Sequence, residues 1–185
     1  MNKTKPKVII AHGWAGDTRS GWINWLTQEL SQQGYSVQVP QLPAPRRPVM
    51  EDWINTLINT AGESKDLILV GHSLGTFALR HLIKRLPSDV KVQKLILVAG
   101  FYLDENSSYW EGYHLTGDDF AKIKARCEQI YCIYSNNDKM VEPNWTRIVC
   151  DKLDGNLILL PKMGHFTQYK VDKIPTILDI ISQNN

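Results

Sequence analysis

Short runs of apolar residues, rich in valine and isoleucine, recur along the chain and are separated by longer, more polar stretches. The runs cover residues 8–11, 35–39, 67–70, 95–99, 130–134 and 157–160. Continuous apolar runs of this length are typical of strands that are covered on both faces, whereas strands with one wet face alternate between apolar and polar residues. The pattern therefore predicts six buried parallel strands.

Between these runs, apolar residues recur at intervals of three and four, a spacing that predicts helices with one buried face. The predicted helices cover residues 22–30, 53–61, 75–86, 118–127, 145–153 and 175–181. Pro48 precedes the second helix, Gly62 follows it, and Pro87 ends the third. Strands that alternate with helices form parallel sheets with right-handed crossovers. We therefore expect a three-layer α/β/α sandwich with a mainly parallel sheet of about six strands.

The length and composition fit a single domain over residues 1–185. Lys and Arg number 21 against 19 Asp and Glu, and this net charge of +2 gives no reason to expect a nucleic-acid partner. The three cysteines, Cys127, Cys132 and Cys150, show no CxxC spacing and predict neither a disulfide framework nor a zinc site. The first apolar run is too short for a signal peptide and no stretch could span a bilayer, so we expect a cytoplasmic protein without a membrane partner.

The sequence Gly71-His72-Ser73-Leu74-Gly75 joins a predicted strand directly to a predicted helix. This is the setting of a nucleophile elbow, in which the serine sits on a turn so tight that glycines must flank it. The turn lifts the hydroxyl clear of the sheet, and the start of the helix aims backbone N–H groups, notably that of Leu74, at developing negative charge. We therefore predict Ser73 as a nucleophile. The alternative is an ordinary strand–helix turn capped by serine.

A serine hydroxyl needs a base, and the base needs an acid that orients it, in the chain order serine, acid, histidine for this type of turn. Asp138 follows the fifth apolar run, and His165 follows the sixth. The carboxyl ends of parallel strands meet at one edge of the sheet, so both side chains are expected beside Ser73. Asp104, which follows the fourth run, is the alternative acid.

The other four histidines have simpler explanations. His72 is expected to pack in the core, pointing away from the hydroxyl of Ser73, and His81 falls on a predicted helix near its boundary with solvent. His114 would break the expected chain order if it were the base. His12 ends the first apolar run, where it either supports the adjoining loop or touches the substrate.

The segment His12-Gly13-Trp14 follows the first strand, where a loop brings the second oxyanion donor in this type of site. The backbone N–H of Trp14 is the candidate donor, and the alternative is a turn that the glycine merely loosens. Nearby, residues 40–48 hold four prolines and predict a stiff, extended connection across the top of the sheet. The candidates for contacts with the substrate are His12, Trp14, Phe101, Tyr102 and Trp110.

The last three candidates belong to the connection between the fourth and fifth strands. This connection is too short for a large cap domain, so the site should be shallow and open. Its aromatic residues either line that site or pack over the sheet.

With these motifs the chain resembles the α/β-hydrolase superfamily, and more closely the small serine hydrolases of the retinoblastoma-binding protein 9 family and their bacterial relatives. The resemblance rests on the chain length and on the segments His12-Gly13-Trp14, Gly71-His72-Ser73-Leu74-Gly75, Asp138-Lys139-Met140-Val141 and Gly164-His165-Phe166. It implies a triad of Ser73, Asp138 and His165 and a minimal fold without the first antiparallel strands of larger relatives. The Leu-x-Cys-x-Glu motif of the retinoblastoma-binding member is absent, so that partner is not implied.

The sequence thus predicts a serine hydrolase of the carboxylesterase kind that acts through an acyl-enzyme on Ser73. Small carboxylic esters are the expected substrates, with thioesters or amides as alternatives, and no metal or organic cofactor is expected. The competing hypothesis is a hydrolase-fold protein that mainly binds a protein partner and retains residual hydrolysis. An intact set of serine, acid and histidine argues against it, because binding needs none of them.

Overall fold

A computed structural model of the protein describes residues 5–19, 21–102, 117–167 and 169–183. Within these ranges, six strands form one parallel sheet in the order β2-β1-β3-β4-β5-β6. The strands are β1 (Lys7–Ala11), β2 (Val37–Gln38), β3 (Asp66–His72), β4 (Lys91–Val98), β5 (Cys127–Tyr134) and β6 (Asn156–Leu159). The helices are α1 (Gly21–Gln32), α2 (Met50–Ala61), α3 (Leu74–Arg85), α4 (Gly117–Arg126), α5 (Pro143–Leu153) and α6 (Pro175–Ser182).

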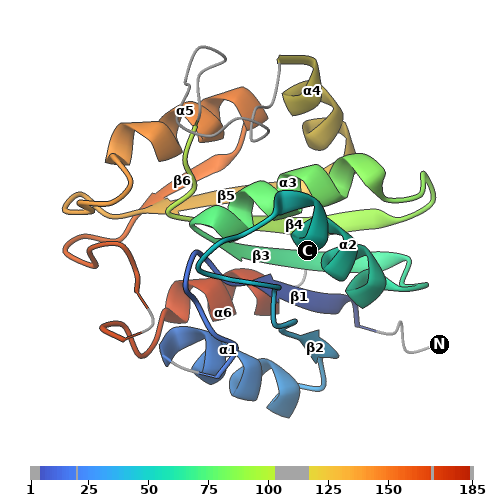
Figure 1. Ribbon diagram of the computed structural model, residues 1–185, viewed down its shortest axis with the longest axis horizontal. Helices are drawn as coiled ribbons and strands as arrows, with labels where there is room; N and C mark the ends of the chain where they lie inside the picture. Colours follow the sequence, from blue (N-terminus) through green and yellow to red (C-terminus); the bar gives the residue numbers. More distant parts are fainter. Residues whose placement is uncertain (1–4, 20, 103–116, 168, 184–185) are drawn as a thin grey trace.

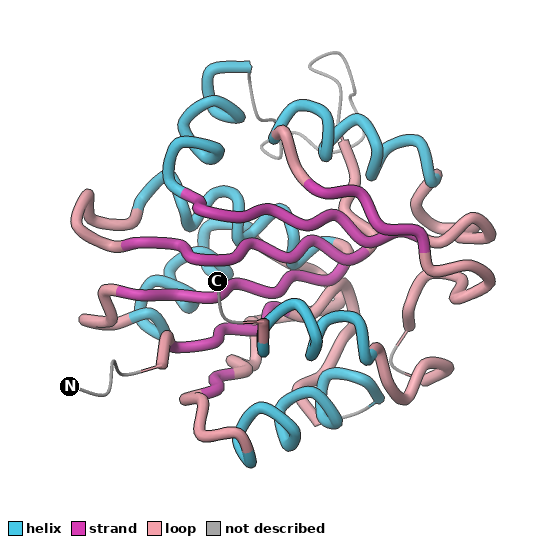
Figure 2. The backbone as a smooth tube through the Cα atoms, turned by 180° about the vertical axis from the view of Figure 1, so that it is seen from behind, coloured by secondary structure: helices cyan, strands magenta, loops and turns pink. Residues whose placement is uncertain are grey.

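Helices cover the sheet on both faces, as Figures 1 and 2 show from opposite sides. α1 and α6 pack on one face, where Val8, Ile10, Ile68 and Val70 point. The helices α2, α3, α4 and α5 pack on the other face against the alternate residues of the same strands. Because side chains alternate along a strand, a strand covered on both faces needs an unbroken apolar sequence. The predicted three-layer α/β/α sandwich with a parallel sheet is confirmed.

The two edge strands differ from the prediction of six buried strands. β2 is only two residues long. On β6, the side chains of Leu157 and Leu159 are 42% and 44% exposed. An edge strand has a neighbour on one side only, and the flanking helices reach it less completely. The expectation that all six apolar runs are covered on both faces is therefore wrong for the edges and right for the central strands.

The strand order has its topological switch point between β1 and β3. From β1 the chain proceeds through α1 to β2 on one side, and then through α2 to β3 on the other side of β1. The two connecting helices therefore lie on opposite faces of the sheet and diverge above the ends of these strands. Parallel sheets bind their ligands at such a switch point. His12 and Ser73 directly follow the two strands that flank it.

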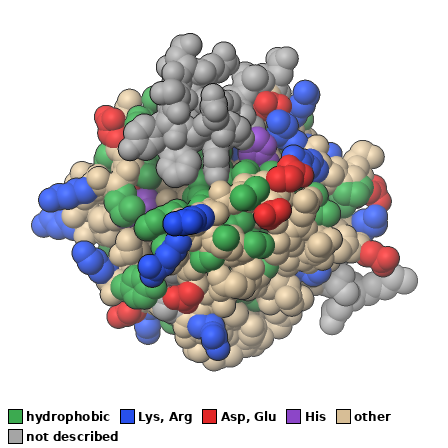
Figure 3. Space-filling model, viewed as in Figure 1, with side chains coloured by type: hydrophobic (Ala, Val, Ile, Leu, Met, Phe, Trp, Pro, Cys, Tyr) green, Lys and Arg blue, Asp and Glu red, His purple; other side chains and the backbone are tan. Residues whose placement is uncertain are grey.

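The surface carries charges of both signs side by side. Figure 3 shows Lys and Arg interspersed with Asp and Glu among apolar and neutral groups on one face of the molecule. This mixture agrees with the net charge of +2 for the whole chain. No helix among the described residues is both long and apolar enough to cross a membrane.

Candidate active site

The turn between β3 and α3 holds Ser73 in a backbone conformation that residues other than glycine rarely adopt. Its φ is 50° and its ψ is −119°. Such a conformation costs on the order of 1–3 kcal/mol and persists only where its surroundings enforce it. Here the N–H of Ser73 donates to Val98 O at 2.9 Å, and its carbonyl accepts from Thr76 N and Thr76 Oγ1 at 3.0 and 2.7 Å. The β3–α3 turn is therefore fixed at both of its polar backbone groups.

Two glycines make this turn possible by allowing close approach. A Cβ on Gly75 would collide with the carbonyl oxygens of Ala11 and His12, so α3 could not begin against the end of β1. A Cβ on Gly71 would lie 2.9 Å from Thr76 Cα. Any side chain at either position would push the helix away from the sheet.

Ser73, His165 and Asp138 form a continuous line of hydrogen bonds. The Oγ of Ser73 lies 3.0 Å from Nε2 of His165, and Nδ1 of His165 lies 2.8 Å from Oδ2 of Asp138. A carboxylate only accepts, so Nδ1 carries the proton and Nε2 offers its lone pair to the serine hydroxyl. The three predicted side chains are thus brought together in the order that proton transfer requires.

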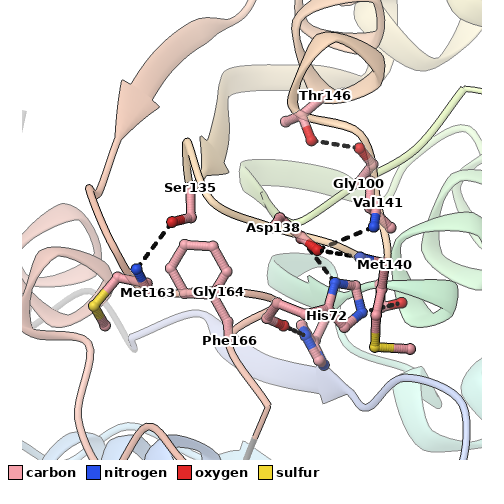
Figure 4. Close-up of polar contacts among 12 residues, drawn as sticks. His72, Gly100, Ser135, Asp138, Met140, Val141, Thr146, Met163, Gly164 and Phe166 are labelled. Atoms are coloured by element: carbon pink, nitrogen blue, oxygen red, sulfur yellow. Dashed lines mark hydrogen bonds and ion pairs between the residues drawn. The ribbon is translucent and has the colours of Figure 1, made fainter.

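The carboxylate of Asp138 is held by its own loop. Its second oxygen, Oδ1, accepts from the backbone N–H groups of Met140 at 2.8 Å and Val141 at 3.0 Å. Figure 4 shows these two bonds and the bond to the imidazole meeting on the one side chain. Donors on both oxygens fix the orientation of the carboxylate.

Three polar residues before Asp138, which the sequence did not single out, tie its loop to the loop that carries His165. Asn137 Oδ1 accepts from Gly164 N at 2.8 Å, and Asn136 Oδ1 accepts from Lys162 N at 3.1 Å. Ser135 Oγ accepts from the N–H of Met163 at 2.9 Å, a contact that Figure 4 also shows. The signal was the run of short polar side chains after β5, since such side chains readily bond to nearby backbone.

The loop after β1 approaches Ser73 closely. A Cβ on Gly13 would lie 3.0 Å from Cβ of Ser73. Within the described ranges, the backbone N–H groups of Trp14 and Leu74 donate no hydrogen bond to the protein. Leu74 is also the first residue of α3, where the helix dipole favours negative charge. The loop that carries Trp14 and the start of α3 at Leu74 therefore both lie beside Ser73.

The proline-rich loop at residues 40–48 is more than a stiff connection. The N–H of Ala15 donates to Pro45 O at 2.8 Å, and Nε1 of Trp14 donates to Arg46 O at 3.1 Å. These bonds join two loops from neighbouring strand ends. The indole of Trp14 stays 53% exposed at the rim of the site.

His12 is enclosed between these two loops. Its ring is fully buried, Nδ1 lies 2.8 Å from the carbonyl oxygen of Gly13, and Nε2 accepts from the N–H of Leu42 at 3.2 Å. A carbonyl only accepts, so Nδ1 bears the proton and the imidazole is neutral. Burial lowers the pKa of His12 in agreement with this state. Both ring nitrogens are occupied, which fits support of the loop better than contact with a substrate.

The remaining predicted residues either pack against other aromatic rings or lie outside the described ranges. Phe101 is buried against Phe77, with ring centroids 4.6 Å apart, and Tyr102 is half-buried with its ring 6.2 Å from that of Phe120. Both side chains pack over the sheet. Three other residues named from the sequence, Asp104, Trp110 and His114, lie outside the described residues.

His72 is buried, as expected from its place beside Ser73, but it also contacts the histidine of the triad. Its Nε2 donates to the backbone carbonyl of His165 at 2.8 Å. Burial, with His165 as the second cause, lowers the pKa of His72 to about 3. The ring is therefore neutral at every pH at which the protein is expected to work.

Among the described residues, no group of three or more His, Cys, Asp and Glu side chains is arranged to hold a metal ion. The thiols of Cys127, Cys132 and Cys150 are all free.

The same residues fall within one protein family. Residues 8–178 match the family described as serine hydrolase. The chain belongs to the serine hydrolase family. The YdeN protein of Bacillus subtilis is similar to this serine hydrolase, with 25% identity over 179 residues, which are 95% of this chain and 94% of YdeN.

Solved structures share the fold of this serine hydrolase. The crystal structure of the ydeN gene product of B. subtilis matches with a TM-score of 0.87 at 24% identity, over 96% of this chain and 97% of that chain. An α/β-superfamily protein from Xanthomonas campestris gives a TM-score of 0.67 at 16% identity, over 88% and 89%. A carboxylesterase structure from Nitrososphaera gargenis gives 0.71 at 13% identity, over 98% and 90%. The chain therefore has the minimal fold of these α/β-hydrolase structures. Its membership of the serine hydrolase family makes it a hydrolase.

Acid is expected to destabilise this serine hydrolase through His72. The imidazole titrates near 6.5 in the unfolded chain and near 3 in the folded protein. Between these values the unfolded chain binds more protons, so the free energy of unfolding falls as the pH drops. The contribution of His72 is a loss of roughly 2 kcal/mol between pH 7 and pH 5.

Urea unfolding at the two pH values measures this loss. His72→Gln has no titrating ring and should lose less stability than the wild type on acidification. His12 and His81, whose pKa values burial also lowers, stay in both proteins and cancel in the comparison. Equal losses in the two proteins would contradict the assignment.

Proposed function

We propose that this serine hydrolase cleaves small carboxylic esters, or the related thioesters and amides, through an acyl-enzyme on Ser73. The observation that carries the proposal is the hydrogen-bonded line from Ser73 Oγ through the imidazole of His165 to Asp138. Packing of these side chains would not by itself require the hydroxyl, the imidazole and the carboxylate to be aligned in this way. Aligned in this way, the three groups can move a proton from the hydroxyl as it attacks a carbonyl.

In the proposed first step, Nε2 of His165 accepts the proton of Ser73 while Oγ bonds to the carbonyl carbon of the substrate. Asp138 holds the Nδ1–H and stabilises the imidazolium that forms. The carboxylate can do this because Met140 and Val141 already fix its other oxygen.

Negative charge then collects on the former carbonyl oxygen. The N–H groups of Leu74 and Trp14 are the proposed donors to it. Leu74 follows Ser73 directly, the loop that carries Trp14 comes close to Ser73 at Gly13, and neither N–H donates elsewhere among the described residues. The loop that carries Trp14 is held in place by the contacts of His12 and Ala15 with the proline-rich loop at residues 40–48.

The tetrahedral species collapses when His165 returns its proton to the leaving alcohol, thiol or amine, and the acyl group remains on Ser73. Water enters by the same route: His165 takes a proton from the water, which attacks the acyl carbon, and then gives the proton back to Oγ. The carboxylic acid leaves and the serine is restored. Neither half-reaction needs a group that the chain itself does not supply.

The proposed size of the substrate follows from the connection above the site. Only residues 99–126 join β4 to β5, and the ten-residue helix α4 takes up a third of them. This is too little chain for a separate cap domain. A long acyl chain would need the apolar surface that a cap domain supplies, whereas a short acyl group does not.

Ser73→Ala should abolish the activity. Without the nucleophile, hydrolysis of 4-nitrophenyl acetate should fall by at least about a thousandfold, and labelling by a fluorophosphonate probe should disappear. Ser182→Ala is the matched control, because this half-buried serine ends α6 and its hydroxyl donates to Gln33. Failure of the folded wild-type protein to label would contradict the proposal and favour the hypothesis of a protein-binding module.

Asp138→Asn should slow ester hydrolysis by roughly 10²- to 10⁴-fold, because an amide cannot stabilise the imidazolium and can hold the wrong tautomer. Asp104→Asn, which changes the alternative acid in the same way, should retain most of the wild-type rate. Comparing kcat/KM of the two variants decides between them. A larger loss with Asp104→Asn would assign the acid to Asp104.

Acyl length should discriminate strongly between substrates. We expect kcat/KM to be highest for the 4-nitrophenyl esters of acetate and butyrate and to decline for octanoate and palmitate, because the connection from β4 to β5 is too short to form a cap domain over a long acyl chain. Each rate is corrected with Ser73→Ala, which keeps the surface and lacks the nucleophile. A maximum at palmitate would show that a long-chain site exists and would overturn the proposed substrate class.

A further inference from the structure

Two ring N–H groups hold the backbone at His165, whose imidazole faces Ser73, and at the residue that follows it. Nε2 of His72 donates to the carbonyl oxygen of His165 at 2.8 Å, and Nε1 of Trp22 donates to the carbonyl oxygen of Phe166 at 2.9 Å. A carbonyl oxygen only accepts, so both rings are donors. The two donors come from different elements, since His72 ends β3 and Trp22 lies in α1.

The loop that they hold has a backbone that needs support. Lys162, Gly164 and Phe166 all have positive φ values, of 62°, 59° and 53°. Two of these residues have a Cβ, for which this conformation is unfavourable. Neighbouring contacts must therefore keep the loop in this shape, and the two ring donors act where His165 is attached.

The rings also pack against each other. Trp22 meets His72 edge to face, with centroids 5.9 Å apart, and His72 lies 5.1 Å from the ring of His165. On its other side, Nδ1 of His72 lies 3.2 Å from the point where a Cβ on Gly13 would stand. The buried ring of His72 thus has Gly13 in the loop after β1, Trp22 in α1 and His165 as its neighbours.

We propose that His72 and Trp22 are positioning residues for His165, fixing its backbone so that the imidazole stays within reach of Ser73. The proposal rests on the proposed function, in which His165 is the base. His72 is the residue directly before Ser73, so one strand end carries the nucleophile and also holds the base. A short closed circuit results: Ser73 to His72 by the chain, His72 to His165 by one hydrogen bond, and His165 back to Ser73 by another.

The neutrality of His72 suits this position. During the reaction the ring of His165 becomes a cation, and a second cation 5.1 Å away would oppose it. Burial keeps the pKa of His72 near 3, so its ring offers a donor without a competing charge. A lysine or arginine could donate the same bond only together with a charge.

Packing alone would explain a buried aromatic ring at residue 72. The test must therefore separate the effect of the side-chain volume from the effect of the N–H donor. His72→Phe keeps a planar ring and removes the donor. His72→Gln replaces the ring by an amide whose Nε2 can reach the same carbonyl. His81→Phe is the matched control: His81 lies in α3, its ring is also partly enclosed, and its Nε2 has no partner among the described residues.

We expect His72→Phe to lower kcat for 4-nitrophenyl acetate by about 10- to 100-fold with KM changed less than about twofold, because a small displacement of a base costs rate more than binding. His72→Gln should recover most of kcat, and His81→Phe should leave it unchanged. Where His72→Phe does not fold, as thermal unfolding will show, Trp22→Phe removes the other donor and should lower kcat in the same way. Wild-type kcat in a folded variant that lacks the donor, or equal losses with His72→Gln and His72→Phe, would overturn the proposal.

A second readout does not depend on catalysis. The Nδ1–H proton between His165 and Asp138 should give a low-field proton resonance in the Ser73→Ala background, where the proposed reaction cannot occur. We expect the resonance to persist with His72→Gln and to broaden or vanish with His72→Phe. If wild type and Ser73→Ala hydrolyse esters equally, the proposed function fails, whereas a resonance unchanged by His72→Phe refutes the positioning role.

Discussion

The site depends on the close approach of α3 to the end of β1. Gly75 sits so near the carbonyl oxygens of Ala11 and His12 that no side chain fits there, and this contact sets the sharpness of the turn that carries Ser73. This sharp turn gives Ser73 its positive φ and leaves the N–H of Leu74 at the N-terminus of α3. The free energy for this strained turn comes from the core beneath it, where Phe77, Ala78 and Leu82 are buried against the sheet.

Much of the fold could be predicted from the sequence because its signals are periodic. Unbroken apolar runs marked the central strands, and spacing of three and four marked the helices, with ends within a few residues of those observed. The edge strands were harder, since Leu157 and Leu159 look in sequence like the residues of a central strand and differ only in what the fold places beside them. Strand order is set by tertiary packing and leaves no local mark.

For the site, the sequence pointed to the residues whose neighbours are distinctive: a serine between glycines, and an aspartate and a histidine after strands. It could not show the contacts that hold them, because those join segments far apart in the chain. Asn137 reaches Gly164 across 27 positions, and His72 reaches the carbonyl of His165 across 93. A histidine in the core and a histidine that donates to a particular carbonyl look alike in sequence, since burial and hydrogen bonding are both properties of the folded chain.

The span of these contacts also affects when the site can exist during synthesis. Ser73 and His165 are 92 positions apart in the chain, and Trp22 and the Phe166 carbonyl to which it donates are 144 positions apart. A nascent chain that has completed β1, β3 and β4 therefore contains Ser73 but does not yet contain His165. Because the loop that carries His165 follows β6, the ribosome has to synthesise the chain beyond Phe166 before the imidazole can meet the serine hydroxyl.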